Sequence, residues 1–127
     1  MRYRAGKTLR LKNTREISRM FHEGLRARDS RLTIIGSVRD GGGELPSRMA
    51  AAVSGRHGNA VARNRVKRLC REAFRTSRGN LPVGWDFVML PRPGVSLTLG
   101  GLRSSLTALC VKILAKSERN KETGDDS

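Results

Sequence analysis

The chain has 127 residues, which suits one domain with a modest core, and it carries 26 Lys and Arg residues against 11 acidic ones. A formal charge of +15 on so small a domain implies a nucleic acid or another anionic surface as its partner. No apolar run is long enough to span a bilayer, and the basic N-terminus lacks the apolar stretch of a signal peptide, so we expect a cytoplasmic protein.

The N-terminal part predicts a basic arm followed by a short helix. Residues 1–12 are expected to form a flexible arm. Asn13 or Thr14 can cap a helix that ends at His22, and Gly24 can stop it. The apolar stripe of this helix consists of Ile17, Met20 and Phe21.

Three segments predict strands. Ser30–Val38 is rich in β-branched residues, and Ser47–Ser54 is apolar in its middle, as expected of a strand covered on both faces. Trp85–Leu90 predicts a third strand, which Pro91 ends. The glycines of residues 40–43 predict a turn, because no helix cap or Lys-Ser/Thr pair follows to make a phosphate-binding loop.

The stretch from Asn59 to Arg78 predicts an amphipathic helix, since no Gly or Pro interrupts it and Asn59 can cap its start. The residues on its apolar face are Ala62, Val66, Leu69, Cys70, Ala73 and Phe74. The opposite face holds Asn64, Lys67, Arg68, Arg71, Arg75 and Arg78, with Arg63 and Arg65 at its flanks. Like charges at helical spacing destabilise a helix, so this face indicates a polyanionic partner more than an ordinary solvated surface or a membrane.

The C-terminal part predicts a last helix from Leu97 to Lys116, capped by Ser96 or Thr98, and a polar disordered tail over residues 117–127. The order helix–strand–strand–helix–strand–helix indicates one α+β domain, residues 13–116, in which helices pack against a single sheet.

No catalytic or metal-binding constellation emerges from the sequence. His22 and His57 have no Cys, Asp or Glu at ligand spacing, and Asp86 is interpreted as structural. Cys70 and Cys110 lie on apolar helix faces and are expected to fill the core. We therefore predict no catalytic residue and no metal site in this chain.

The segment GNAVARNRVKRLCREAFR, residues 58–75, resembles the signature of the protein component of bacterial ribonuclease P. The centre of the pattern is Arg63-Asn64-Arg65, followed by Lys67-Arg68 and Arg71-Glu72, and the resemblance extends from about Leu11 to Leu114. It implies a four-stranded sheet with three helices, as in the second domain of ribosomal protein S5. It also implies a left-handed βαβ crossover, where the general rule would give a right-handed one.

The resemblance also implies a function: an RNA-binding subunit of an endoribonuclease that removes the 5′ leader from precursor tRNA. In that family the catalyst is an RNA that holds the Mg²⁺ ions, so the expected partners are this catalytic RNA and precursor tRNA, with no membrane and no DNA. The residues expected to contact the catalytic RNA are Arg56, Arg63, Asn64, Arg65, Lys67, Arg68, Arg71 and Arg75.

A second surface, a cleft between the first helix and the sheet, is implied to bind the single-stranded leader through Ile17, Phe21 and Ile35. Phe21 matches an aromatic position of the family, whereas Ile17 and Ile35 stand where aromatic residues are common. Gly55-Arg56 replaces a frequent Lys-Lys pair. Phe21 as an ordinary core residue remains the alternative interpretation.

Two other functions fit the composition. A non-enzymatic ribosomal or RNA-chaperone protein would be as basic as this chain. A helix-turn-helix DNA-binding module fits less well, because the basic helix follows a strand and a loop instead of a short turn from another helix.

Overall fold

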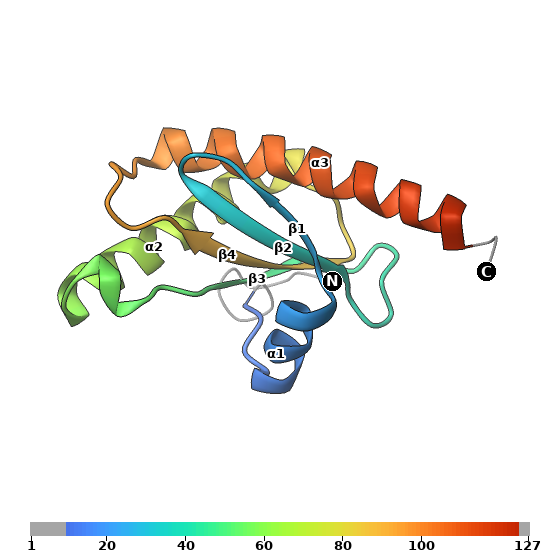
Figure 1. The fold of residues 1–127 in the computed structure, drawn as a ribbon, viewed down its shortest axis with the longest axis horizontal. Helices are drawn as coiled ribbons and strands as arrows, with labels where there is room; N and C mark the ends of the chain where they lie inside the picture. Colours follow the sequence, from blue (N-terminus) through green and yellow to red (C-terminus); the bar gives the residue numbers. More distant parts are fainter. Residues whose placement is uncertain (1–9, 125–127) are drawn as a thin grey trace.

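The computed structural model describes residues 10–124, which form three α-helices and a four-stranded sheet and confirm the predicted α+β domain. In Figure 1, α2 and α3 lie along one face of the sheet and α1 lies against the other. The helices are α1 (Thr14–Glu23), α2 (Ala60–Ser77) and α3 (Leu99–Gly124), and the 3₁₀ turns are η1 (Gly55–His57) and η2 (Arg78–Asn80). The strands are β1 (Leu25–Arg28), β2 (Leu32–Val38), β3 (Arg48–Ala51) and β4 (Trp85–Pro91).

The strand order is β1-β2-β4-β3. The first three of these pair antiparallel, whereas β3 runs parallel to β4, and α2 connects the two parallel strands. The residue pattern did not predict β1, because its sequence LRAR has no β-branched residue. The strand forms by pairing with β2 across a tight turn, in which the Asp29 carboxylate accepts hydrogen bonds from the backbone N–H groups of Arg31 (2.9 Å) and Leu32 (3.0 Å). The strand predicted from Ser30 therefore begins at Leu32.

Side-chain caps fix where the helices begin. Asn13 caps α1 by accepting from the N–H groups of Arg15 and Glu16, and Asn59 caps α2 as predicted. Thr98 accepts from Gly101 N at the start of α3. Gly24 ends α1 in extended backbone. A glycine is required there because a Cβ atom would collide with Ile35 Cγ2 and lie 2.6 Å from the carbonyl oxygen of Met20.

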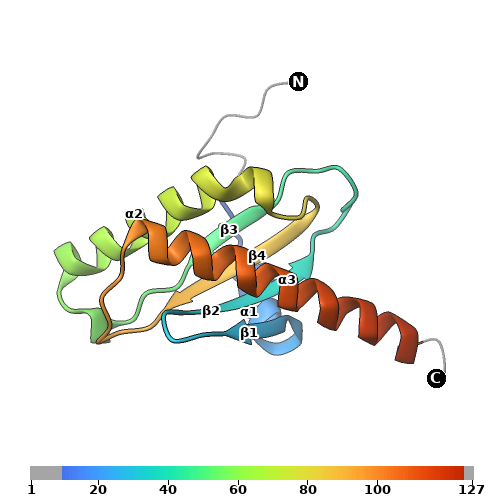
Figure 2. The ribbon, with the colours of Figure 1, turned by 90° about the horizontal axis from the view of Figure 1, so that it is seen from above.

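The main core lies between the sheet and the two long helices. Figure 2 shows these helices from above: α2 packs along β3, and α3 runs over β2 and β1. The largest fully buried side chains in this layer include Phe74 of α2, Phe87 of β4 and Leu106 of α3. Cys70 and Cys110 are part of it, as predicted.

The opposite face of the sheet carries a much smaller apolar cluster, formed by Leu11, Met20, Ile35 and Val88. Leu11 enters it because the N–H of Leu11 donates to the carbonyl oxygen of Met49 (2.8 Å) and Arg10 forms a parallel bridge with Met49. Residues 10 and 11 therefore do not belong to a flexible arm. The rest of the predicted arm, residues 1–9, lies outside the described residues.

The predicted end of the last helix at Lys116 is wrong, because α3 continues to Gly124. The polar composition of residues 117–124 suggested a disordered tail. Extending an existing helix costs far less than nucleating one, and Glu, Arg and Lys are good helix formers. Lys116 also donates to the carbonyl oxygen of Arg26, which attaches this part of α3 to β1. Residues 125–127 of the predicted tail lie outside the described residues.

Candidate nucleic-acid interface

Helix α2 has the two faces that its sequence predicts. Cys70, Ala73 and Phe74 are buried against the sheet and α3. The outward residues, which we call the basic face of α2, are Asn64, Arg65, Lys67, Arg68, Arg71 and Arg75. Lys67 and Arg71 are half-buried and the other four are exposed, so most of these groups are open to a ligand from solvent.

Few acids neutralise the basic face. Arg75 pairs with Glu72 one turn away, and the hydrogen bond from Arg75 holds the pKa of Glu72 below its ordinary value. Within residues 10–124 no ion pair engages the remaining basic side chains of α2, and Asn64 forms no hydrogen bond through its amide. The Nε of Arg63 is shielded from solvent without a hydrogen-bond partner in the described part of the chain. Apart from this shielded Nε, the unpaired basic side chains of α2 and the Asn64 amide are free for an external acceptor.

A groove of about 330 Å³ runs beside this face. We call it the β3 groove, because Met49, Ala50 and Ala51 form its floor. One wall consists of Lys67 and Arg71 of α2. The other wall consists of Arg10, Leu11, Lys12 and Ile17, from α1 and the segment before it. The groove thus has an apolar floor between two basic rims, which suits a polyanionic strand with apolar faces.

The expectation that the second predicted strand is covered on both faces holds in part. Ala51 packs against the main core and Ala50 against the smaller cluster, yet both are half-buried and line the groove. As β3 is the last strand of the sheet, α1 does not reach across it. The small side chains of Ala50 and Ala51 leave a shallow surface, and Met49 beside them is buried in the main core. That run of alanines beside a basic helix was the sequence signal for a groove at this place.

The structure separates the three residues predicted for the leader cleft. Ile17 lines the β3 groove, next to Lys67 and Arg71. Phe21 is 37% exposed, and the guanidinium of Arg26 stands 5.8 Å from its ring centroid. Ile35 is fully buried beneath Gly24, so it supports α1 from below and presents no surface to a ligand.

Sequence reasoning missed several groove residues. Arg10 and Lys12 were assigned to a flexible arm, yet they form a basic rim opposite α2. Their position depends on pairing with Met49, a contact between distant parts of the chain that no local pattern reveals. Arg56, which was predicted to contact RNA, is exposed in η1, just before α2 begins.

Asp86 has the structural role that its sequence position suggested. It is 5% exposed and accepts two hydrogen bonds from Arg48, to Oδ1 from Nε and to Oδ2 from Nη2, both 2.8 Å long. Nη2 also donates to Oε2 of Glu16 at 2.8 Å. These bonds, led by those to Asp86, raise the pKa of Arg48.

His57 and the two cysteines take part in hydrogen bonding and core packing within the fold. His57 donates from Nε2 to the carbonyl oxygen of Pro91 (2.9 Å). Burial raises the pKa of the Cys70 and Cys110 thiols to about 12. Across residues 10–124, no group of three or more His, Cys, Asp or Glu side chains is arranged to hold a metal ion. No helix in the same range is long and apolar enough to cross a membrane.

Comparison with known proteins adds to this geometry. The family model described as Ribonuclease P matches residues 6–114. A ribonuclease P protein component from Brevibacillus brevis is 38% identical over 98 residues, which cover 76% of each chain. One from Shouchella clausii is 35% identical over 119 residues, 91% of this chain and 96% of that one. Among solved structures, the RNase P protein from Thermotoga maritima superposes with a TM-score of 0.71 at 28% identity, covering 82% of this chain and 96% of the other.

Proposed function

The chain belongs to the ribonuclease P protein family, and on that premise we propose that it binds the catalytic RNA of this enzyme through α2 and the 5′ leader of precursor tRNA in the β3 groove. Membership makes the chain a subunit of a tRNA 5′-processing enzyme, and it does not favour the ribosomal or RNA-chaperone alternative. The division of labour between the two surfaces is the proposal.

The observation that carries the proposal is that Lys67 and Arg71 belong to both surfaces. They lie on the basic face of α2 and also form one wall of the β3 groove. An RNA strand held along α2 and a single strand lying in the groove would therefore run side by side. Arginine and lysine between them offset the repulsion of two phosphate backbones.

In this proposal the RNA subunit carries out hydrolysis with Mg²⁺ ions that it binds itself. The protein contributes charge and position. Arg65 and Arg68 make charge-assisted hydrogen bonds to phosphates of the catalytic RNA, and the Asn64 amide donates and accepts at once. Arg56 and Arg63 extend this contact at the start of α2, and Arg75 extends it at the other end. The enzyme acts in the cytoplasm.

The leader contact uses stacking and apolar surface in the groove. Ile17, Ala50 and Ala51 offer apolar surface to bases, and Arg10, Lys12, Lys67 and Arg71 face the phosphates. Phe21, with its exposed ring, offers one aromatic platform at the far end of α1. Arg26 over this ring adds a cation next to the platform.

Cleavage of precursor tRNA by a bacterial ribonuclease P RNA, with and without this protein, tests the proposal. At low Mg²⁺ concentration the RNA alone should be nearly inactive, and adding the protein should restore cleavage at the mature 5′ end. The purified protein without RNA should not cleave. Cleavage restored to the same extent on a substrate whose leader is a single nucleotide would contradict the leader contact. Cleavage by the RNA-free protein would contradict the assignment of catalysis to the RNA.

A further inference from the structure

Helix α1 forms a wall of the β3 groove, yet the apolar core holds it weakly. Met20 is its one buried residue, and Ile17 is half-buried. Among the described residues, the apolar cluster beneath it has Leu11, Ile35 and Val88 as its further buried members. Apolar contact is not directional, so a cluster of this size leaves the tilt of a short helix poorly defined.

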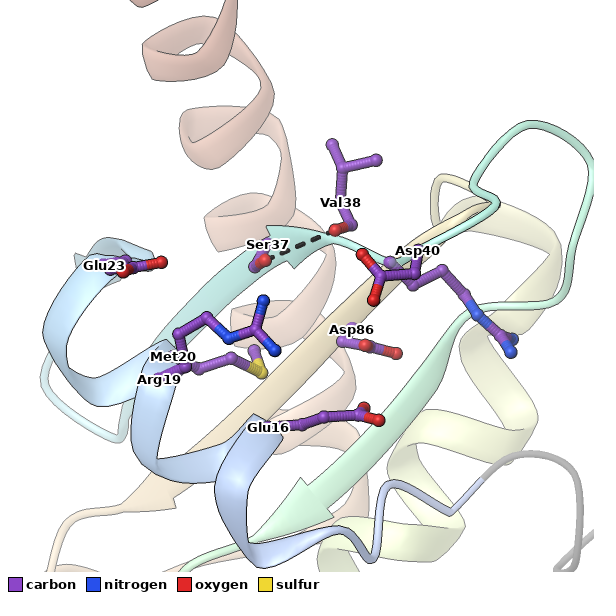
Figure 3. Close-up of a pocket in the computed structure, with 9 residues that line it drawn as sticks. Glu16, Arg19, Met20, Glu23, Ser37, Val38, Asp40 and Asp86 are labelled. Atoms are coloured by element: carbon purple, nitrogen blue, oxygen red, sulfur yellow. Dashed lines mark hydrogen bonds between the residues drawn. The ribbon is translucent and has the colours of Figure 1, made fainter.

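A directional contact exists one residue before Ile17. Glu16 accepts a hydrogen bond from Nη2 of Arg48 at 2.8 Å, and this ion pair links α1 to the first residue of β3. In Figure 3 the Glu16 side chain leaves α1 on the side where Asp86 stands on β4. Side-chain exposure is 32% for Glu16 and 21% for Arg48, so water screens this pair only in part.

Arg48 is itself held in place by Asp86. The two residues are register partners in the parallel β3–β4 pair, and both guanidinium–carboxylate bonds measure 2.8 Å. A buried carboxylate needs a paired cation, so Asp86 fixes the plane and direction of the guanidinium. The position of α1 therefore depends on Arg48 of β3, and the position of Arg48 depends in turn on Asp86 of β4.

From this geometry we infer that Glu16 is a positioning residue for leader binding, which holds the α1 wall of the β3 groove through Arg48 and Asp86. Glu16 does not line the groove, whereas its neighbour Ile17 does. Breaking the link should let α1 move against β3 and change the groove without removing any group that touches RNA. This inference rests on the leader contact proposed above.

The test uses the reconstituted holoenzyme and measures its affinity for precursor tRNA relative to mature tRNA. In Glu16→Ala this ratio should fall by roughly 2- to 30-fold, the range for breaking one link in a coupled network. Glu16→Gln should keep part of the ratio, because its amide oxygen can still accept from Arg48. Affinity for the catalytic RNA should not fall in either variant.

Glu23→Ala is the matched control. Glu23 is an exposed acid on the same helix and forms no ion pair within residues 10–124. Removing either acid makes the protein more basic and should strengthen RNA binding in general. Only the loss of the Arg48 link should lower the ratio, so Glu23→Ala should keep the ratio of the unmodified protein.

Each outcome decides between two explanations. A Glu16→Ala protein that melts like the unmodified one and keeps its ratio overturns the inference, and so does an equal fall in Glu23→Ala. If Glu16→Ala does not fold, Glu16→Gln is measured in its place. A lowered ratio in Glu16→Gln supports the inference, and an unchanged ratio overturns it. An unmodified holoenzyme with no preference for precursor tRNA refutes the proposed leader contact itself, which is a different failure.

Discussion

The two faces of the sheet differ in how completely they are covered. On one face α2 and α3 bury Phe74, Phe87, Leu106 and most of the other apolar side chains of the protein. On the other face a short helix covers a cluster with four buried residues in the described part of the chain, and it leaves part of β3 open. Stability should therefore depend mainly on the first face, and the second face is free to serve recognition.

The two faces also differ in charge, because basic side chains gather around the open one. Lys67 and Arg71 stand at the border of the open face, across the groove from Arg10 and Lys12. The charged side chains of α2 thus point away from the main core and toward the open face of the sheet. Folding and RNA binding use different atoms of the same helix, so substitutions should separate the two properties.

The largest expected effect is that of salt on RNA binding. If roughly six to ten phosphates are contacted, affinity for the catalytic RNA should fall about 10³- to 10⁵-fold between 50 and 200 mM salt. The melting temperature of the free protein should not fall over this range, because its core is apolar and screening weakens the repulsion among its excess positive charges. Filter binding and thermal melts in the same buffers provide the check. A nearly flat binding curve would show that the basic face is not the interface.

Phe74→Ala tests how much the main core contributes to stability. The ring is 2% exposed and lies in the main cluster, so the free energy of unfolding should drop by about 3–5 kcal/mol. Urea titration of the variant gives this value. RNA affinity, measured where the variant is still folded, should stay near that of the unmodified protein. A large loss of affinity in the folded variant would mean that the two faces are not independent.

Two arginines of α2 can be compared with each other. Arg68→Ala and Arg71→Ala should each weaken assembly with the catalytic RNA by about 1–3 kcal/mol, if each side chain makes a charge-assisted hydrogen bond. Neither should lower the melting temperature, since relieving like-charge repulsion favours the helix. Arg71→Ala should also lower the preference for precursor over mature tRNA, because Arg71 lines the groove and Arg68 does not. Unchanged assembly in both variants would refute the role of α2.

Phe21→Ala should have a much smaller effect on stability than Phe74→Ala. At 37% exposure the ring is not a core residue, and its loss should cost less than about 1 kcal/mol of unfolding free energy. If Phe21 stacks on a leader base, the preference for precursor tRNA should drop by about 1–3 kcal/mol. Thermal melts beside binding assays with both tRNAs measure the two quantities. A folded variant with an unchanged preference would remove Phe21 from the leader site.

The sequence predicted best where the signal is local. Asn59, the uninterrupted run after it and the alternation of apolar and basic residues define α2 without any distant contact. The strand β1 has no such signal, because LRAR becomes a strand only through its partner β2. The end of α3 was misplaced for a related reason: polar residues that would be disordered alone continue a helix that the core has already formed.

The candidate site was predictable in part for the same reason. The basic face of α2 follows from helical periodicity. The groove next to it requires residues 10 and 11 to pair with Met49, which depends on the folded chain. Ile17 and Ile35 were both expected to line the leader cleft, yet one lines the groove and the other is buried under Gly24. The placement of α1 on the sheet, which no local pattern gives, makes this difference.

Hydrogen exchange of the backbone amides tests most directly the claim that the sheet face covered by α2 and α3 stabilises the fold, and that the open face binds RNA. The measurement is made on the free protein, on its complex with the catalytic RNA, and on that complex with mature or precursor tRNA. Catalytic RNA should slow exchange at the start of α2. Added to that complex, precursor tRNA should give further protection in α1 and β3, and mature tRNA should not. The amides of α3 should be protected throughout and change little. Protection that appears on α3, or equal protection of α1 by mature and precursor tRNA, would contradict the account.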